Sequence, residues 1–333
     1  MRYAYYPGCS LTHSAEPYDR STKAIAAPLG LSLEEIDDWN CCGATEYISI
    51  NKNAAYALVG RNLALAANQG VSSDLVAPCS ACYLNLRKVD HYMGKFPELR
   101  DKTNAALAAG NLHYEPGSMH VRHLLDVVVE DVGYEAIKEH VVRPLDGLRV
   151  APYYGCLIVR PQLNGGGAAS PERSGGATND PEYPMHLDRL LRSLGAEVVD
   201  FPLKTHCCGG HMTQISADTA YELIRRLLHN AREYQADIIV TACPMCQLNL
   251  DAYQSQVNRH FGTDFHLPVL YFTQMIGLAM GMAPRDLGIG REVVSAAAAL
   301  GKIGTRAPAA PSAAPRRKRD DKALPMPRQR EEA

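Results

Sequence analysis

Two stretches of this chain carry one pattern: DLVAPCSACYLNL at residues 74–86 and IIVTACPMCQLNL at residues 238–250. In both, a short and mainly apolar run leads into Cys-x-x-Cys, and Leu-Asn-Leu follows at the same offset. Such a run is typical of a buried strand, and the residues after it fit a helix. The pair therefore predicts two copies of one strand–loop–helix unit.

The ten cysteines of the chain extend this repeat. Each half holds one single cysteine, then Cys-Cys-Gly, then the Cys-x-x-Cys. The flanks repeat as well, because Tyr-Pro-Gly precedes the first single cysteine and Tyr-Tyr-Gly precedes the second. An internal duplication of about 150 residues, the size of a domain, is the economical explanation. The first set is Cys9, Cys41, Cys42, Cys79 and Cys82, and the second is Cys156, Cys207, Cys208, Cys243 and Cys246.

Strand and helix patterns alternate along each copy. Apolar residues share a helical face between residues 55 and 66, with Gly70 placed as a C-cap, and again between residues 223 and 231. This alternation predicts the α/β class: two similar duplicated domains, each with a mostly parallel sheet flanked by helices. Nearly every cysteine group follows a strand, so cluster sites are expected at the C-terminal edges of the strands, where such folds bind ligands. Five runs predict strands: residues 2–6, 74–77, 149–153, 197–201 and 237–242.

The repeat also places the domain boundaries. Residues 1–145 are predicted to form the first copy, residues 146–290 the second, and residues 291–333 a helical extension with a disordered C-terminal tail. The copies differ at residues 160–184, a glycine-rich segment that lengthens the second one. We expect a flexible surface loop there, which could be a lid over a site or an inert insertion.

Composition excludes several classes of protein. Of 333 residues, 46% are hydrophobic and 21% charged, as in a soluble globular protein. A net charge of −2 gives no field that would attract nucleic acid, so no nucleic-acid partner is expected. The N-terminus shows no apolar signal segment, and residues 267–284 divide better into a short strand and a helix than into a membrane span. We expect a cytoplasmic protein, associated with membranes only through partners.

Clustered thiols in a reducing compartment indicate metal or redox chemistry. A thioredoxin-like pair would use two cysteines of each copy and leave three unexplained. A structural zinc site takes four ligands and leaves one thiol spare. An iron–sulfur cluster can use all five, although the cysteine spacing of ferredoxins is absent. The spacing favours iron–sulfur and leaves open zinc in one half and a thiol-only site.

The doubled Cys-Cys-Gly resembles the cysteine-rich CCG-domain family, and more closely the B subunit of heterodisulfide reductase. The resemblance covers residues 1–284, and one Cys-Cys-Gly alone would be a weak signal. Its specific pieces are Tyr6-Pro7-Gly8-Cys9, Cys41-Cys42-Gly43, Ala77-Pro78-Cys79-Ser80-Ala81-Cys82, Cys207-Cys208-Gly209-Gly210-His211, Cys243-Pro244-Met245-Cys246 and Leu267-Pro268-Val269-Leu270.

By this resemblance, each set holds one noncubane [4Fe–4S] cluster, with all five of its cysteines as ligands. The two clusters would face one another between the copies and cleave or form a disulfide between thiol substrates. A metal that stabilises a leaving thiolate would replace a proton donor in that reaction. The catalytic candidates among the cysteines are Cys9, Cys41, Cys42, Cys156, Cys207 and Cys208.

The resemblance also implies partners. The chain has no dinucleotide or nucleotide-triphosphate motif, so electrons must come from a separate carrier. In the family this is an iron–sulfur C subunit, with a flavin-containing A subunit beyond it. The substrate is a thiol/disulfide or a sulfur-carrier protein, and an arginine-rich composition favours a bacterial role in sulfur oxidation. Two alternatives are an electron-transfer subunit of a succinate- or lactate-type dehydrogenase and a structural zinc protein.

Other polar residues near the cysteines have candidate roles. His206 and His211 flank the second Cys-Cys-Gly and could donate protons to a departing thiolate, or lie outside the chemistry. Asn85 and Asn249 could hydrogen-bond cluster sulfur or be structural. Trp39 could shield a cluster from water or pack in the core.

Four further residues are weaker candidates. His120 and His123 are expected in a connecting helix and are assigned no metal. Arg160 and Lys204 could attract an anionic substrate, but nothing in the sequence singles them out.

Overall fold

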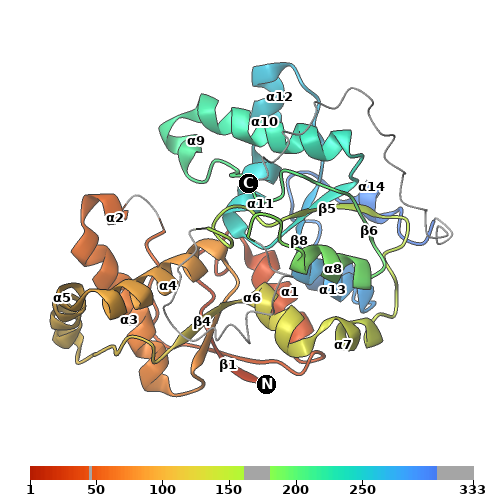
Figure 1. The fold of residues 1–333 in the computed structure, drawn as a ribbon. Coiled ribbons are helices and arrows are strands. Elements are labelled where there is room, and N and C mark those ends of the chain that lie inside the picture. Colours follow the sequence, from red (N-terminus) through yellow and green to blue (C-terminus); the bar gives the residue numbers. More distant parts are fainter. Residues whose placement is uncertain (45–46, 161–180, 306–333) are drawn as a thin grey trace, which may run out of the picture.

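Two parallel sheets form the framework of the protein (Figure 1). The structure, a computed structural model, describes residues 1–44, 47–160 and 181–305. The sheet orders are β2-β1-β3-β4 and β6-β5-β7-β8, with every neighbouring pair parallel, so the predicted fold class is confirmed. The strands are β1 (Arg2–Tyr5), β2 (Ser32–Glu35), β3 (Asp74–Ala77), β4 (His120–His123), β5 (Arg149–Tyr153), β6 (Glu197–Val198), β7 (Ile238–Thr241) and β8 (Val269–Tyr271).

Helices connect the strands and cover the sheets, as parallel pairing requires. The first half contains α1 (Glu16–Ala26), α2 (Tyr47–Ile50), α3 (Lys52–Gln69), α4 (Ser80–Lys95), α5 (Pro97–Leu107), η1 (Ala108–Gly110), α6 (Leu124–Asp126), the π-helical turn η2 (Val127–Val132) and α7 (Tyr134–Glu139). The second half contains α8 (His186–Ser193), α9 (Met212–Ile215), α10 (Ala217–Glu233), α11 (Pro244–Ala252), α12 (Gln254–Phe261), α13 (Phe272–Ala279), η3 (Pro284–Leu287) and α14 (Ala297–Leu300).

The central strands lie in the core because they are apolar along most of their length. All four positions of β7 are buried, and three of the four in β1 and in β3. Strands covered on both faces carry continuous apolar runs of this kind. The edge strand β2 has no fully buried position, and its Ser-Leu-Glu-Glu sequence therefore carried no signal that predicts a strand.

One prediction from the sequence was wrong. His120 and His123 belong to strand β4, where a connecting helix was expected, and β4 pairs with β3 so that Ala77 lies beside His123. The sequence His-Val-Arg-His has little strand propensity, and pairing with a buried neighbour decides its conformation. The His123 ring is completely buried, and its Nδ1 accepts a hydrogen bond from the Leu125 N–H at 3.1 Å.

Other local predictions have mixed outcomes. Gly70 does end α3, at φ +64, and residues 267–284 do divide into strand β8 and helix α13. The strand predicted at 197–201 is shorter, because β6 ends at Val198. Among the described helices, none combines the length and the apolar character of a membrane span. The tail from residue 306 and most of the segment 160–184 lie outside the described residues, and the domain boundaries stay predictions.

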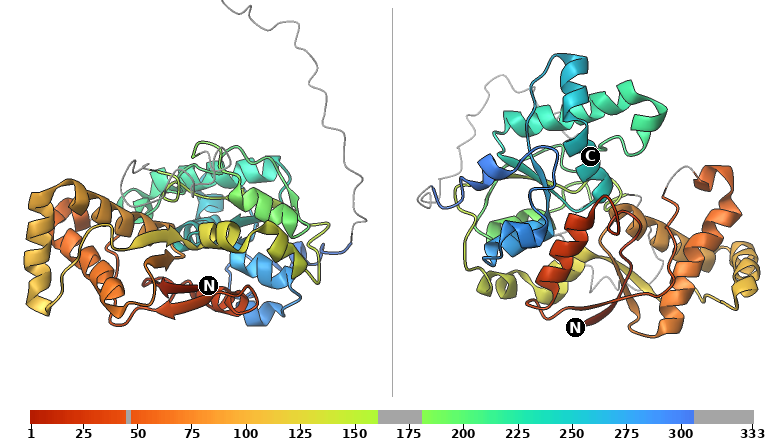
Figure 2. Two further views of the ribbon diagram at one scale, coloured as in Figure 1. Left: turned by 60° about the horizontal axis from the view of Figure 1, so that its bottom comes forward. Right: turned by 180° about the vertical axis from the view of Figure 1, so that it is seen from behind.

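Helices of one half pack directly against helices of the other half (Figure 2). Helix α1 of the first half packs on α13 of the second, and α6 of the first half packs on α8 of the second. At the first contact the rings of Tyr18 and Tyr271 stack, with centroids 4.3 Å apart. The Tyr18 hydroxyl donates to the Pro78 carbonyl at 3.1 Å and approaches the Ala242 carbonyl at 3.4 Å. Tyr18 therefore joins the two halves directly in front of both Cys-x-x-Cys motifs.

Replacing Tyr18 with Phe tests this junction. The stacked ring is kept, but the buried carbonyls lose their donor, so we expect a loss of about 1–2 kcal/mol in the free energy of unfolding. Denaturant titration measures it, with Tyr234→Phe at an exposed position as the matched control. Equal stability of the two variants would contradict a bridging role for the Tyr18 hydroxyl.

Candidate functional site

All ten cysteines follow strands at the C-terminal edges of the two sheets. In the first half Cys9 follows β1, the Cys-Cys pair follows β2, and Cys79 and Cys82 follow β3. The second half repeats this order after β5, β6 and β7. Because the strands are parallel, their ends meet at one edge, which gathers each set of five thiols. All ten are free cysteines.

The thiols within each set are close enough to share a bound group. The Sγ atoms of Cys9 and Cys41 lie 3.6 Å apart, and those of Cys42 and Cys82 lie 3.2 Å apart. In the second set the Sγ atoms of Cys208 and Cys246 are 3.6 Å apart, and Cys156 is hydrogen-bonded to Cys207. Three cysteines of each set are buried, namely Cys42, Cys79 and Cys82 in the first and Cys208, Cys243 and Cys246 in the second. Cys9, Cys41 and Cys207 are exposed, and Cys156 is partly buried.

Each Cys-x-x-Cys sits at the start of a helix. Cys79 is the N-cap of α4 and Cys243 is the N-cap of α11, so Cys82 and Cys246 fall in the first turns. Unpaired N–H groups at a helix start carry partial positive charge and favour thiolate. The site thus supplies charge that suits anionic sulfur ligands.

A glycine in each half leaves room for the cysteine sulfur. Gly8 has φ +73 and Gly155 has φ +69, a conformation that favours glycine. A Cβ on Gly8 would lie 2.9 Å from the Cys82 Sγ, and one on Gly155 would lie 2.8 Å from the Cys246 Sγ. Both positions therefore require glycine for two independent reasons.

Two tyrosines tie the first cysteine loop of each half to its Cys-Cys loop. The Tyr6 hydroxyl donates to the Asn40 carbonyl at 2.7 Å, and the Tyr153 hydroxyl donates to the His206 carbonyl at 2.7 Å. Each acceptor residue immediately precedes a Cys-Cys pair. Sequence reasoning did not assign these tyrosines a role, although both stand three positions before a single cysteine. Trp39 packs edge-on against the Tyr6 ring at 5.4 Å and covers it.

The two asparagines after the Cys-x-x-Cys motifs hold the Cys-Cys loops from the other side. Asn85 Nδ2 donates to the Cys42 carbonyl at 3.0 Å, and Asn249 Nδ2 donates to the Cys208 carbonyl at 3.1 Å. Asn249 also lies 3.5 Å from the Cys208 Sγ. Both predicted roles of Asn249 therefore apply, a structural bond and a contact with ligand sulfur, whereas Asn85 contacts only the backbone here.

One exposed thiol in each set is held as thiolate. Hydrogen bonds from the Cys42 and Cys9 thiols lower the pKa of Cys41 to about 2, and a hydrogen bond from Cys156 lowers the pKa of Cys207 to about 6. The Gly43 and Gly209 N–H groups donate to these sulfurs at 3.4 and 3.3 Å. The donor cysteines respond in the opposite direction, since the same hydrogen bonds raise the pKa of Cys9 and of Cys156.

The two sets meet at the interface between the halves. The Cys79 and Cys243 thiols are hydrogen-bonded to one another, which raises the pKa of Cys79. Hydrogen bonds with Cys246 and then with Cys79 lower the pKa of Cys243. His211 adds a second link, because its Nε2 lies 2.8 Å from the Ala44 carbonyl, just beyond the first Cys-Cys-Gly. Residues from both copies therefore form one continuous site.

The remaining candidates lie in different surroundings. His206 is exposed and immediately precedes Cys207, and His211 follows the second Cys-Cys-Gly-Gly segment. Lys204 is buried and pairs with Asp188 at 3.2 Å, and Arg160 pairs with Glu182. Neither cation is free to attract a substrate in this arrangement.

The fold and this site define a class of protein: a tandem α/β protein with two cysteine-rich centres suited to metal. The cysteine-rich domain family (CCG) matches residues 3–87 and 150–251. The chain therefore belongs to this CCG family, and its relatives include heterodisulfide reductase B subunits.

The relatives differ in the complexes to which they belong. The chain is 33% identical to the 8-methylmenaquinol:fumarate reductase membrane anchor subunit of Wolinella succinogenes, over 88% of this chain and 97% of that protein. It is 32% identical to the B subunit of a CoB-CoM heterodisulfide reductase of Methanosarcina acetivorans, over 90% and 95%. A protein of Archaeoglobus profundus that is described as like the heterodisulfide reductase B subunit is 31% identical, over 86% and 93%.

A solved structure shares the fold. A hypothetical protein from Helicobacter pylori superposes with a TM-score of 0.66 at 16% sequence identity, over 88% of this chain. The chain spans 51% of that protein's length, and the likeness concerns the fold alone.

Replacing Gly155 with Ala should displace the Cys246 sulfur and empty the second centre. We expect bound iron to fall by about half if each set holds one cluster. Metal analysis of anaerobically purified protein measures this. Gly30→Ala is the matched control, because Gly30 has the same φ of +69 with nothing within 4 Å of its Cβ position. Equal iron in both variants would contradict the packing argument.

Thiol reactivity of the chain freed of metal by chelation should be uneven. Thiolate is the reactive form, so iodoacetamide should modify Cys41 and Cys207 at about pH 7.5 well before the buried Cys82 and Cys246. Because the pKa of Cys207 is lowered to about 6, its labelling should stay fast above that pH and fall about tenfold per unit below it. Mass spectrometry of timed samples gives the order, and uniform labelling would contradict the assignment.

Proposed function

We propose that this chain is the disulfide-converting subunit of a multi-subunit oxidoreductase, with one [4Fe–4S] cluster in each cysteine set. The observation that supports the proposal is the contact between Cys79 and Cys243, because it joins the two cysteine sets. A disulfide takes up two electrons and two protons to give two thiols. Two adjacent one-electron centres match that requirement, and a single isolated centre does not.

The donor sets fit such clusters. Each half offers five converging thiols, more than one zinc ion uses, and a glycine makes space beside a ligand sulfur. When bound, the clusters would supply electrons and iron that stabilises leaving thiolates. All ten cysteines would be ligands: Cys9, Cys41, Cys42, Cys79 and Cys82 in the first set, and Cys156, Cys207, Cys208, Cys243 and Cys246 in the second.

The residues of the chain would orient and protect this site. The Gly43 and Gly209 N–H groups stabilise negative charge on Cys41 and Cys207. The buried Cys79 and Cys243 face one another away from water, while the exposed Cys9, Cys41 and Cys207 mark the side open to substrate. His206 lies beside this open side, where its ring could return a proton to a departing thiolate. We assign His211 to positioning, because its ring is bound to the Ala44 carbonyl.

Electrons would reach the site through partner proteins. We propose an iron–sulfur C subunit and a flavin-containing A subunit, which the family resemblance implies. The Methanosarcina relatives are named as B subunits of heterodisulfide reductases, which supports a multi-subunit assembly. A cytoplasmic location, with membrane contact only through partners, is consistent with this assembly. A bacterial sulfur-oxidising direction would run the same chemistry in reverse, with a sulfur-carrier protein as substrate.

A second function is favoured by the similarity to the fumarate reductase anchor subunit. In that role the same two centres would pass electrons between a dehydrogenase and its partner, without disulfide chemistry. The cysteine geometry serves either role. Activity toward a disulfide therefore separates the two.

The deciding experiment uses the full chain purified without oxygen. We expect about eight iron and eight acid-labile sulfide per chain, an EPR signal after oxidation in the presence of thiol, and reduction of a disulfide by reduced viologen dye. Cys207→Ser should abolish turnover, whereas Gly30→Ala should leave it unchanged. Full clusters without turnover would favour the electron-transfer role, and zinc without sulfide would overturn both redox interpretations.

A further inference from the structure

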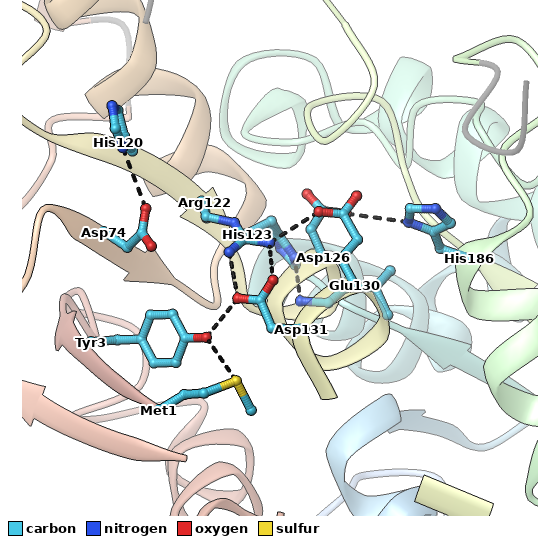
Figure 3. Close-up of polar contacts among 11 residues, drawn as sticks. Met1, Tyr3, Asp74, His120, Arg122, His123, Asp126, Glu130, Asp131 and His186 are labelled. Carbon is cyan, nitrogen blue, oxygen red and sulfur yellow. Dashed lines mark hydrogen bonds and ion pairs between the residues drawn. The ribbon is translucent and has the colours of Figure 1, made fainter. Parts of the chain in front are cut away.

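Three potential metal ligands meet away from the cysteines, at the second contact between the halves (Figure 3). Asp126 lies at the end of α6 and Glu130 in the turn η2, both in the first half. His186 begins α8 in the second half. Their ligand atoms all lie within 4.8 Å of one another, with the His186 Nδ1 3.5 Å from the Asp126 Oδ1.

The backbone conformation directs the two carboxylates to the same side. Asp126 and Glu130 are four residues apart across the start of the π-helical turn η2, which turns both side chains toward α8. Single π-helical turns within helices occur often at functional sites. Divalent ions bind histidine and carboxylate at about 2.0–2.2 Å, so two ligands of one ion lie about 3–4 Å apart. The observed spacing needs only small side-chain movements to reach that value.

The imidazole of His186 is the unsatisfied member of the cluster. His186 is 5% exposed, and its Nδ1 is buried with no hydrogen-bond partner among the described residues, because the approach to Asp126 lacks hydrogen-bond geometry. A buried nitrogen without a partner is costly, and a metal ion at this point would satisfy it. In Figure 3 the ring points toward the carboxylate side chains.

The two candidate carboxylates have different charged partners. Arg122 pairs with Glu130 at 3.0 Å and with Asp131, whereas the ion pair of Asp126 is with His186. Asp131 is held separately by Arg122 and by the Tyr3 hydroxyl at 2.5 Å.

The internal duplication provides a comparison. Leu-Gly pairs at residues 29 and 194 follow α1 and α8, and aligning these pairs makes Ser21 the equivalent of His186. The Ser21 hydroxyl is satisfied by a hydrogen bond with the Thr273 hydroxyl at 2.6 Å. One contact between the halves is thus completed by protein atoms alone, whereas the other brings a buried imidazole against two carboxylates.

We propose that Asp126, Glu130 and His186 bind one divalent cation of the Zn²⁺ or Mn²⁺ class and so join the two halves. One imidazole with two carboxylates suits these ions better than Ca²⁺ or Mg²⁺, which prefer oxygen alone. The carboxylates are partly exposed, with side-chain exposures of 19% and 27%, and give the ion a path from solvent. Remaining coordination positions would face a hollow lined by Tyr83, Tyr154 and Ile158, where water has room.

The test uses the full chain with its clusters and Mn²⁺ as the probe, because thiolates bind this hard ion poorly. EPR titration should find one bound Mn²⁺ per chain, with nitrogen coupling that changes when histidine is labelled with ¹⁵N. His186→Gln and Glu130→Gln should each weaken binding about tenfold or more, and the first should abolish the nitrogen coupling. Addition of Mn²⁺ should also raise the melting temperature of the unchanged chain and of neither variant.

His120→Gln is the matched control, since His120 lies 3.5 Å from Asp74 on β4 but belongs to no three-ligand cluster of the described residues. It should keep wild-type Mn²⁺ affinity. Bound Mn²⁺ that survives both site variants, or no Mn²⁺ binding at millimolar concentration, would overturn the proposal. Iron and sulfide measured on the same samples report separately on the cysteine centres, so this proposal and the proposed function can fail independently.

Discussion

The Cys79 thiol lies against the Cys243 thiol, and this contact constrains the structure around it. Each cysteine caps a helix that follows a central strand, so the two sheets must present the same edge to one another. Tyr18 fills the space in front of both motifs and donates to the carbonyl that precedes each of them. Tyr18 belongs to α1, and this helix packs on α13 of the second half.

The duplication makes each feature of the site a repeated observation. Four features occur twice, at equivalent positions. They are the hydrogen bond from a tyrosine to the Cys-Cys loop, the hydrogen bond from an asparagine to the same loop, the glycine beside a sulfur, and the N–H donor to an exposed sulfur. A contact that forms once could be incidental. A contact that forms in both copies, between residues of the same type, indicates a requirement of the site.

The copies also differ, and the differences are informative. The pKa of Cys41 is lowered to about 2, and that of Cys207 only to about 6, because Cys41 accepts hydrogen bonds from two neighbouring thiols. The two helix contacts between the halves differ as well. A hydrogen bond between two hydroxyl groups links α1 to α13, whereas a carboxylate of α6 faces an imidazole of α8. The two halves therefore have the same framework but unequal electrostatics, as expected when duplicated parts acquire separate roles.

The duplication, the α/β class, the central strands and the ten candidate cysteine ligands could all be predicted from the amino-acid sequence, because spacing and apolar runs are local properties. Strands β2 and β4 could not, since their conformation depends on pairing with a buried neighbour. The sequence also did not predict the hydrogen bonds of Tyr6 and Tyr153 to the Cys-Cys loops, or the cluster of Asp126, Glu130 and His186. Those groups lie far apart along the chain, and only the tertiary packing brings them together.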